Sequence, residues 1–424
     1  MSGLALLLTM FGLIALRVPI TFSLGIAGLS FFILNGIPLN SFASKLAVSV
    51  DSFPLLALPF FILAGNLMNN GGITRRLFAL ADALLGSVRG GLSYVCIISS
   101  MIFSALSGSA LANAAGLGTI QIKAMEERGY DKEFSACLTA SAAVLGPIIP
   151  PSVIMIIYGV TAGVSIKEMF LGGMLPGLVL SGMYAVMCFY YGRKLNFPKG
   201  DKFNPREAWR AFKDAFWALM TPTIILGGIF GGVFTATEAG AVACLYTFIV
   251  GLFIYRDLKI RDIGKILLDS GKNCGAILFI AATASVLGFC LTYARVPQSL
   301  AAILVEYISN KYALLLIFMV VYLFLGTIMD GGAIVITTVP IFVPLCTALG
   351  IDLVYFGVFV GILMSLGTIT PPVGTAMFVI CRNTGLPIER FTISMLPWFA
   401  LIAVFVILLV FVPQIITWLP AVMR

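Results

Sequence analysis

The sequence contains no histidine. This absence excludes histidine-ligated zinc or haem, catalysis by a serine–histidine pair, and proton relays through imidazole. Charged residues are also scarce: they make up 10% of the 424 residues, whereas a soluble domain has roughly 25%. Hydrophobic residues account for 60% of the chain. We therefore expect a protein surrounded by lipid and not an enzyme.

The eight cysteines have no CxxC spacing, and most lie in apolar stretches. This pattern favours packing residues over a disulfide or metal framework. The apolar runs are continuous rather than alternating, which argues against the strands of a β-barrel. Helices satisfy their own backbone groups in lipid, and about 20 residues cross a bilayer. The sequence therefore predicts an all-α polytopic membrane protein, and Met1–Leu16 is expected to be its first hydrophobic element rather than a cleaved signal.

Basic residues concentrate in two segments. Seven lie in 193–213 and five in 256–272, so both segments are expected to face the cytoplasm. Two apolar spans, about 215–234 and 239–255, separate them and return the chain to the same side. We interpret both segments as amphipathic helices at the membrane interface. The formal charge of +8 therefore gives no indication of nucleic-acid binding.

A shift of 221 residues aligns the two halves of the chain without a gap over a long stretch. Gly129–Asp131 then falls on Gly350–Asp352, and Met174–Pro176 falls on Met395–Pro397. Many matches are Gly, Pro, Asp or Glu, which rarely coincide by chance in apolar sequence. Internal duplication is typical of secondary transporters, in which the two repeats often insert with opposite orientation. We expect two inverted repeats.

Each half contains a Gly-Pro-rich interruption, at Gly146–Ser152 and at Gly367–Thr375. Adjacent prolines remove two backbone donors and leave upstream carbonyls without helical partners. At bilayer depth these carbonyls need a bound cation, a protein donor or water, and Na⁺ is a suitable cation. A proline kink repaired by neighbouring helices is the alternative. The presence of the break in both halves favours an ion or substrate site.

A second pair of interruptions precedes the first, at Ser104–Gly116 and Gly326–Gly332. Small and polar residues followed by a short apolar run predict re-entrant helical hairpins. Helix–helix packing through small residues is the alternative, but it does not explain Asn113 or Asp330.

The predicted organisation is a first membrane repeat at 1–192, a cytoplasmic amphipathic connector at 193–214, a scaffold helix pair at 215–255, a cytoplasmic amphipathic segment at 256–272, and a second membrane repeat at 273–424. Hairpins are expected at about 104–125 and 326–348, and broken helices at about 134–160 and 352–381.

Three charged residues, Asp330, Arg382 and Arg295, fall in or near apolar spans. A charge inside the membrane is costly and marks a functional candidate, although an arginine near a span end can also extend to the interface. Arginine is the natural partner of a carboxylate. Asp330 and Arg382 are therefore candidates for the transport cavity, whereas Arg295 is a weaker one.

Over essentially its whole length the chain resembles the large membrane subunit, of the DctM or SiaM type, of a tripartite ATP-independent periplasmic (TRAP) transporter. The residues that carry this resemblance are Arg89–Leu92, Ser107–Ser109 with Asn113, Gly129–Asp131, Gly146–Ser152 and Thr370–Thr375.

The resemblance implies an elevator-type fold in a bacterial inner membrane, and import of an organic carboxylate (C4-dicarboxylate or sialic acid class) by Na⁺ symport. It implies two partner proteins, a DctP-type periplasmic binding protein and a DctQ-type small four-helix subunit. We expect the small subunit to be a separate chain. No organic cofactor is implied, and two or more Na⁺ ions are expected.

The resemblance also implies site residues. The first sodium site would use Ser104, Ser107, Gly146, Ile149 and Pro151, and the second Gly326, Gly367, Thr370 and Pro372. The substrate would lie near Ser109, Asn113, Ser152, Asp330, Thr375 and Arg382. The alternative function is a stand-alone Na⁺-coupled di- or tricarboxylate carrier that needs no binding protein. An intramembrane aspartyl enzyme would need two close carboxylates, and the other acidic residues fall nearer span ends.

Overall fold

The computed structural model describes residues 1–198, 202–296, 299, 310–329, 331–371 and 373–423. The described residues form helices and no β-strand, as predicted. The first half contains α1 (Gly3–Ala15), α2 (Ile20–Leu34), α3 (Leu39–Val50), η1 (Phe53–Leu56), α4 (Ala57–Asn70), α5 (Ile73–Leu85), α6 (Gly91–Ser107), α7 (Ala110–Ala115), α8 (Leu117–Glu127), α9 (Lys132–Ala143), α10 (Val153–Ala162) and α11 (Ile166–Lys194). The second half contains α12 (Pro205–Phe230), α13 (Ala236–Ile249), η2 (Val250–Ile254), α14 (Ile260–Tyr293), α16 (Lys311–Ile328), α17 (Gly331–Ala348), α18 (Leu353–Gly367), α19 (Thr375–Thr384), α20 (Ile388–Phe411) and α21 (Gln414–Val422).

Six helical segments among the described residues are long and apolar enough to cross a membrane: Phe53–Asn70, Ile166–Lys194, Ala236–Ile254, Ile260–Tyr293, Gly331–Ala348 and Ile388–Phe411. Large apolar side chains also point outward from the helices. Val186, Phe324 and Ile393 are 69%, 63% and 67% exposed. Such an apolar exterior is unfavourable in water and suited to a bilayer. The chain is an all-α multi-pass membrane protein.

The 221-residue shift also relates the helices. Hairpin 1, which consists of α6, α7 and α8, has its first break after Ser107. Hairpin 2, which consists of α16 and α17, has its break after Ile328, which is 221 residues later. Two equivalent aspartates cap the helices that follow: Asp131 accepts a hydrogen bond from Phe134 N at 2.8 Å, and Asp352 accepts one from Tyr355 N at 2.7 Å. The same local sequence therefore starts the same element in each half.

The two halves interlock. The second arm of hairpin 1 packs against α19, and the second arm of hairpin 2 packs against α10. The hydroxyl of Ser365 donates to the carbonyl of Val144 at 2.6 Å, across a sequence separation of 221 residues. A residue thus contacts its own repeat equivalent, which is the geometry expected beside an approximate two-fold axis. This contact brings the ends of α9 and α18, and so the two helix breaks, together.

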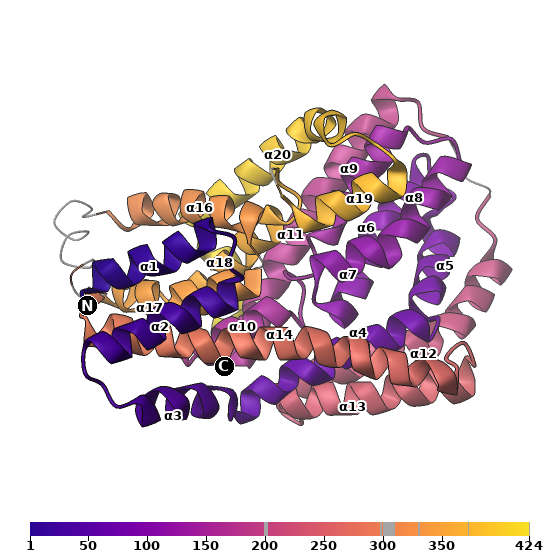
Figure 1. Cartoon of the computed structure of the whole chain (residues 1–424). Helices are drawn as coiled ribbons and strands as arrows, with labels where there is room; N and C mark the ends of the chain where they lie inside the picture. Colours follow the sequence, from indigo (N-terminus) through magenta and orange to yellow (C-terminus); the bar gives the residue numbers. More distant parts are fainter. Residues whose placement is uncertain (199–201, 297–298, 300–309, 330, 372, 424) are drawn as a thin grey trace.

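Two predicted boundaries fall inside single helices. α12 runs without interruption through residue 214, and α14 runs through residue 272 (Figure 1). The change from basic to apolar sequence at these points does not end a helix, because both compositions are compatible with helical backbone. The basic segments are therefore continuous with apolar helices rather than separate elements.

The repeat also extends further than predicted. The shift places α2 on residues 241–255, which are α13 and η2, and places α4 inside α14. The packing agrees, because α2 packs on α14 as α13 packs on α4. Residues 215–255, which the sequence pattern separated as a scaffold pair, therefore match the first helices of the chain. Apolar helices carry few distinctive residues, so the sequence alone did not reveal this match.

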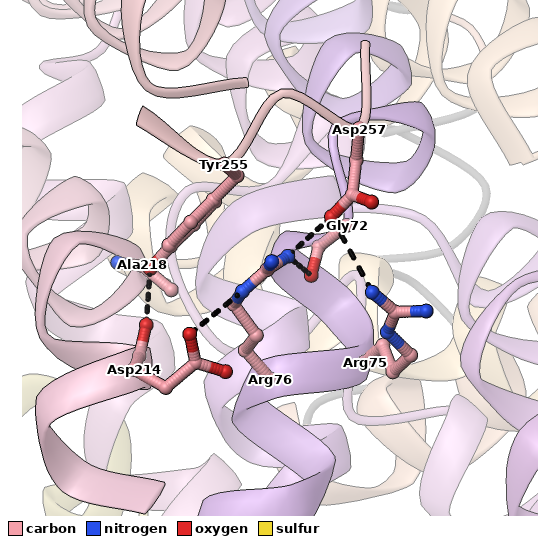
Figure 2. A network of polar contacts seen from close by, with 7 residues as sticks. All are labelled: Gly72, Arg75, Arg76, Asp214, Ala218, Tyr255 and Asp257. Carbon is pink, nitrogen blue, oxygen red and sulfur yellow. Dashed lines mark hydrogen bonds and ion pairs between the residues drawn. The ribbon is translucent and has the colours of Figure 1, made fainter. Parts of the chain in front are cut away.

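A polar network joins α5 to the segments around α12 and α14 (Figure 2). The Arg76 guanidinium contacts Asp257 at 2.5 Å, Asp214 at 3.2 Å and the carbonyl of Gly72 at 3.0 Å. It also stacks 3.8 Å from the centre of the Tyr255 ring. Burial alone would lower the pKa of Arg76, but the two carboxylates outweigh burial and raise it. Arg76 therefore holds three segments together at the α4–α5 joint.

The hydroxyl of Tyr255 is inserted into the backbone of α12 (Figure 2). It donates to the carbonyl of Asp214 at 2.7 Å and accepts from the amide of Ala218 at 3.0 Å. In a regular helix these two backbone groups would bond to each other. Four residues later Pro222 offers no donor to the carbonyl of Ala218. Tyr255 thus bonds to the backbone of the continuous helix α12 where its charged part meets its apolar part.

We predict that Arg76→Ala lowers the stability of the purified protein by about 2 kcal/mol, because it leaves Asp257 without its closest cation. Thermal unfolding in detergent measures the effect. Arg75→Ala is the matched control: Arg75 is 68% exposed and lies 3.4 Å from the same carboxylate, so its loss should change the melting midpoint very little. Equal losses in the two variants would contradict the role given to Arg76.

Candidate ion and substrate site

The hairpin tips and the helix breaks meet in the interior of the protein. Figure 1 shows α7 and α10, which flank the first tip and the first break, near the middle of the molecule. A Cβ added at Gly108, in the tip of hairpin 1, would lie 2.6 Å from the carbonyl oxygen of Pro151. A Cβ added at Gly146 would lie 2.8 Å from the carbonyl of Ser109. Only glycine permits this approach of one backbone to another.

Several buried oxygen atoms at this contact have no protein partner. The hydroxyl of Ser107 is buried and makes no hydrogen bond. No described residue donates a hydrogen bond to the carbonyls of Gly146, Ile149 or Pro151. Buried polar groups normally find partners, so this group of oxygens suits a bound cation. Four of the five residues predicted for the first sodium site thus contribute oxygens without a partner.

Ser104, the fifth residue of the predicted set, is bonded within hairpin 1. Its hydroxyl donates to the carbonyl of Ser100 at 2.5 Å and accepts from Asn113 Nδ2 at 3.4 Å. Its carbonyl accepts from the amide of Gly108 at 3.1 Å. Ser104 therefore connects the first arm of the hairpin with the residues that follow the tip.

Hairpin 2 meets the second break through a pair of glycines. A Cβ added at Gly367 would lie 2.5 Å from the carbonyl carbon of Gly326. The hydroxyl of Thr370 donates to the carbonyl of Leu366 at 2.8 Å, and its oxygen can still act as an acceptor or a ligand. The structure thus brings Gly326, Gly367 and Thr370 into one region. Pro372, also predicted for this site, lies outside the described residues.

The predicted substrate residues fall into two groups. Thr375 and Arg382 are exposed and lie on the same helix, α19, and Ser109 is half-buried at the start of α7. Asn113 and Ser152 are buried: Asn113 bonds to Ser104, and Ser152 caps α10 by accepting from Met155 N at 3.3 Å. The buried pair therefore holds the hairpin and the broken helix in shape. Asp330 lies outside the described residues.

Both hairpins contain a polar bridge that the sequence pattern did not indicate. Gln121 donates to the carbonyl of Cys96 at 3.0 Å and to Ser100 Oγ at 2.9 Å, which joins the arms of hairpin 1. The hydroxyls of Tyr322 and Thr338 lie 2.7 Å apart and join the arms of hairpin 2. In the sequence these bridges are visible only as a polar residue, Gln121 or Thr338, within an apolar run. Such a residue does not show which side chain or carbonyl it will bond to.

Comparison with known proteins agrees with this architecture. The family model of the tripartite ATP-independent periplasmic transporter, DctM component, matches residues 7–415. The chain is 38% identical over 410 residues to the sialic acid TRAP transporter large permease protein SiaM of Vibrio cholerae, with 96% of each chain covered. It is 38% identical over 399 residues to the C4-dicarboxylate TRAP transporter large permease protein DctM of Pseudomonas aeruginosa, with 94% of this chain and 93% of the relative covered.

A solved structure shares the fold. The YdaH transporter of Alcanivorax borkumensis superposes with a TM-score of 0.64 at 16% identity, covering 89% of this chain and 88% of that one. The helical architecture, the paired breaks and the full-length family match lead to one conclusion. The chain belongs to the DctM component family of tripartite ATP-independent periplasmic transporters.

Proposed function

We propose that this chain imports an organic carboxylate across a bacterial inner membrane by symport with Na⁺. The observation that carries the proposal is the group of buried oxygens without partners where hairpin 1 meets the first break. Desolvated oxygens of this kind are costly unless a cation or a donor reaches them. Sodium would be a transported ion here, released on the cytoplasmic side.

The chemistry of the oxygens favours an alkali cation. The set consists of backbone carbonyls and hydroxyls, which carry no net charge. Within the described ranges, no cluster of three or more Cys, Asp or Glu side chains is placed to hold a metal. Ca²⁺ usually recruits carboxylates, and transition metals prefer nitrogen or sulfur ligands. The second site, with Gly326, Gly367 and Thr370, has the same neutral character.

The carboxylate class rests on the relatives, whose names specify sialic acid and C4-dicarboxylate. In this chain we place the substrate beside α19, where Thr375 and Arg382 are exposed. The guanidinium of Arg382 can pair with a carboxylate, and Thr375 and Ser109 can donate hydroxyl hydrogen bonds. We also propose Asp330 beside the substrate, while the buried Asn113 and Ser152 shape the hairpin and the broken helix next to it.

We further propose an elevator movement between inverted repeats. The two hairpins and the broken helices α9–α10 and α18–α19 would form the moving unit, and α1–α4 with α12–α14 the scaffold. Five crossings, by the first broken helix and by α11, α12, α13 and α14, would place the hairpins on opposite sides of the membrane. Opposite hairpins can gate opposite sides of one site.

We predict uptake of labelled C4-dicarboxylate or sialic acid into proteoliposomes that contain this chain, its DctQ-type small subunit and its DctP-type binding protein. Uptake should require an inward Na⁺ gradient and the binding protein. Uptake that persists without the binding protein would favour the stand-alone carrier. Uptake that ignores the sodium gradient would refute the symport mechanism.

Ser107→Ala should raise the Na⁺ concentration for half-maximal uptake by about tenfold, which corresponds to about 1.4 kcal/mol of lost ion binding. The measurement is the sodium dependence of uptake at fixed substrate. Ser181→Ala is the control, because the Ser181 hydroxyl on α11 is bonded to the carbonyl of Gly177 at 2.7 Å. An unchanged sodium dependence in Ser107→Ala would remove this residue from the proposed site.

Gly367→Ala should abolish most uptake, because the added methyl group would collide with the backbone of Gly326. Gly361→Ala lies on the same helix, and its nearest neighbours are 3.8 Å away, so it should be tolerated. Both variants are compared at equal amounts in the membrane. Equal activity of the two would show that the glycine contact between hairpin 2 and α18 is unnecessary.

A further inference from the structure

Helix α4 is held firmly to its neighbours on one face. The amide of Asn66 donates to the hydroxyl of Ser270 on α14 at 2.8 Å. The thiol of Cys244 on α13 donates to the carbonyl of Phe60 at 2.9 Å. A Cβ added at Gly240 on α13 would lie 2.9 Å from the Cβ of Phe60. Hydrogen bonds and close packing therefore fix α4 to α13 and α14.

Another face of α4 touches hairpin 1, but in a different way. A Cβ added at Gly65 would lie 3.6 Å from Ser107 Cα and 3.7 Å from the carbonyl of Leu106, which is ordinary contact. Asn69 is four residues later and thus on the same face. A Cβ added at Gly116, between α7 and α8, would lie 2.7 Å from the side-chain nitrogen of Asn69.

The contact is close but weakly bonded. Within the described chain no hydrogen bond links α4 to hairpin 1, whereas such bonds tie α4 to α13 and α14. The side-chain amide of Asn69 bonds to α5 rather than to hairpin 1, because its oxygen accepts a hydrogen bond from the hydroxyl of Thr74 at 3.2 Å. Glycines on both partners leave a smooth surface. At this face of α4 the hairpin can separate without breaking a hydrogen bond; at the neighbouring helix α5, Asp82 accepts two hydrogen bonds from Arg128 at the end of α8, at 2.8 and 2.6 Å, and these exposed bonds would have to exchange with water.

We propose that Gly65 and Asn69 on α4 form a surface on which hairpin 1 docks in this conformation, and from which it separates in each transport cycle. The proposal rests on the proposed elevator movement and names the positioning residues for it. Docking places α4 directly against the backbone of Ser107, whose buried hydroxyl belongs to the first sodium site. The scaffold thereby covers one side of that site until the hairpin moves.

The test is a reversible cross-link across this surface. Asn69→Cys and Gly116→Cys are introduced into a chain whose eight cysteines, all buried and free, have been replaced. The protein is reconstituted with its small subunit and binding protein. Oxidation should form the 69–116 disulfide and reduce uptake at least tenfold, and reduction should restore it.

The matched control links α4 to the scaffold. Asn66→Cys with Ser270→Cys joins two side chains that are hydrogen-bonded in the structure. This disulfide should form equally well and leave uptake unchanged. Full uptake with the 69–116 disulfide, failure of that disulfide to form, or arrest by the 66–270 disulfide would each overturn the proposal. Absence of uptake in the unmodified protein would instead refute the proposed function.

A second variant makes the test independent of cysteine chemistry. Gly65→Phe should prevent docking and lower uptake at least tenfold at normal membrane levels. Gly182→Phe is the control, since Gly182 on α11 has no atom within 4 Å of an added Cβ. Wild-type uptake by Gly65→Phe would also overturn the proposal.

Discussion

Backbone carbonyl oxygens inside a bilayer need hydrogen-bond donors or a bound cation, and the architecture of this protein depends on this requirement. Helices cross lipid because they bond their own carbonyls, and each half of this chain gives up that bonding at a Gly-Pro break. The freed carbonyls of Gly146, Ile149 and Pro151 stay buried, together with the hydroxyl of Ser107. Such atoms are tolerable only where something else binds them. The breaks are therefore the positions where we propose that an ion is held, and the surrounding helices bring the two breaks together.

Close backbone contact is the means by which the hairpins reach the breaks. Gly108 and Gly146 at the first site, and Gly326 and Gly367 at the second, have almost no room for a side chain. The duplicated sequence produces this contact twice. The residues of each site come from one repeat, whereas the second arm of each hairpin packs on the broken helix of the other half, so each repeat helps to hold the other in place. The hydrogen bond from Ser365 to Val144 ties the two sites together.

Bonding strength differs between the surfaces of the scaffold. Arg76, Asp257 and the hydroxyl of Tyr255 fasten α5, α12 and the segment before α14 to one another with charged and backbone hydrogen bonds (Figure 2). Asn66 fastens α4 to α14. By contrast, α4 meets hairpin 1 through glycines and van der Waals contact. The proposed elevator movement would use both kinds of surface, since one body would stay rigid while the other is released and docked again.

The sequence by itself determined the helical membrane class, the duplication and the positions of the hairpins and breaks, because hydropathy, glycine and proline act on the local backbone. It also indicated Ser107 and Gly146 as candidate site residues, which stays a prediction. Other features depend on the tertiary structure. These are the continuity of α12 and α14, the hydrogen bonds of Gln121 between the arms of hairpin 1, and the hydrogen bond of Asn113 to Ser104 within the same hairpin. A side chain's partner depends on which distant helix lies opposite it. In apolar sequence, where most residues pack equally well, only the assembled fold settles that choice.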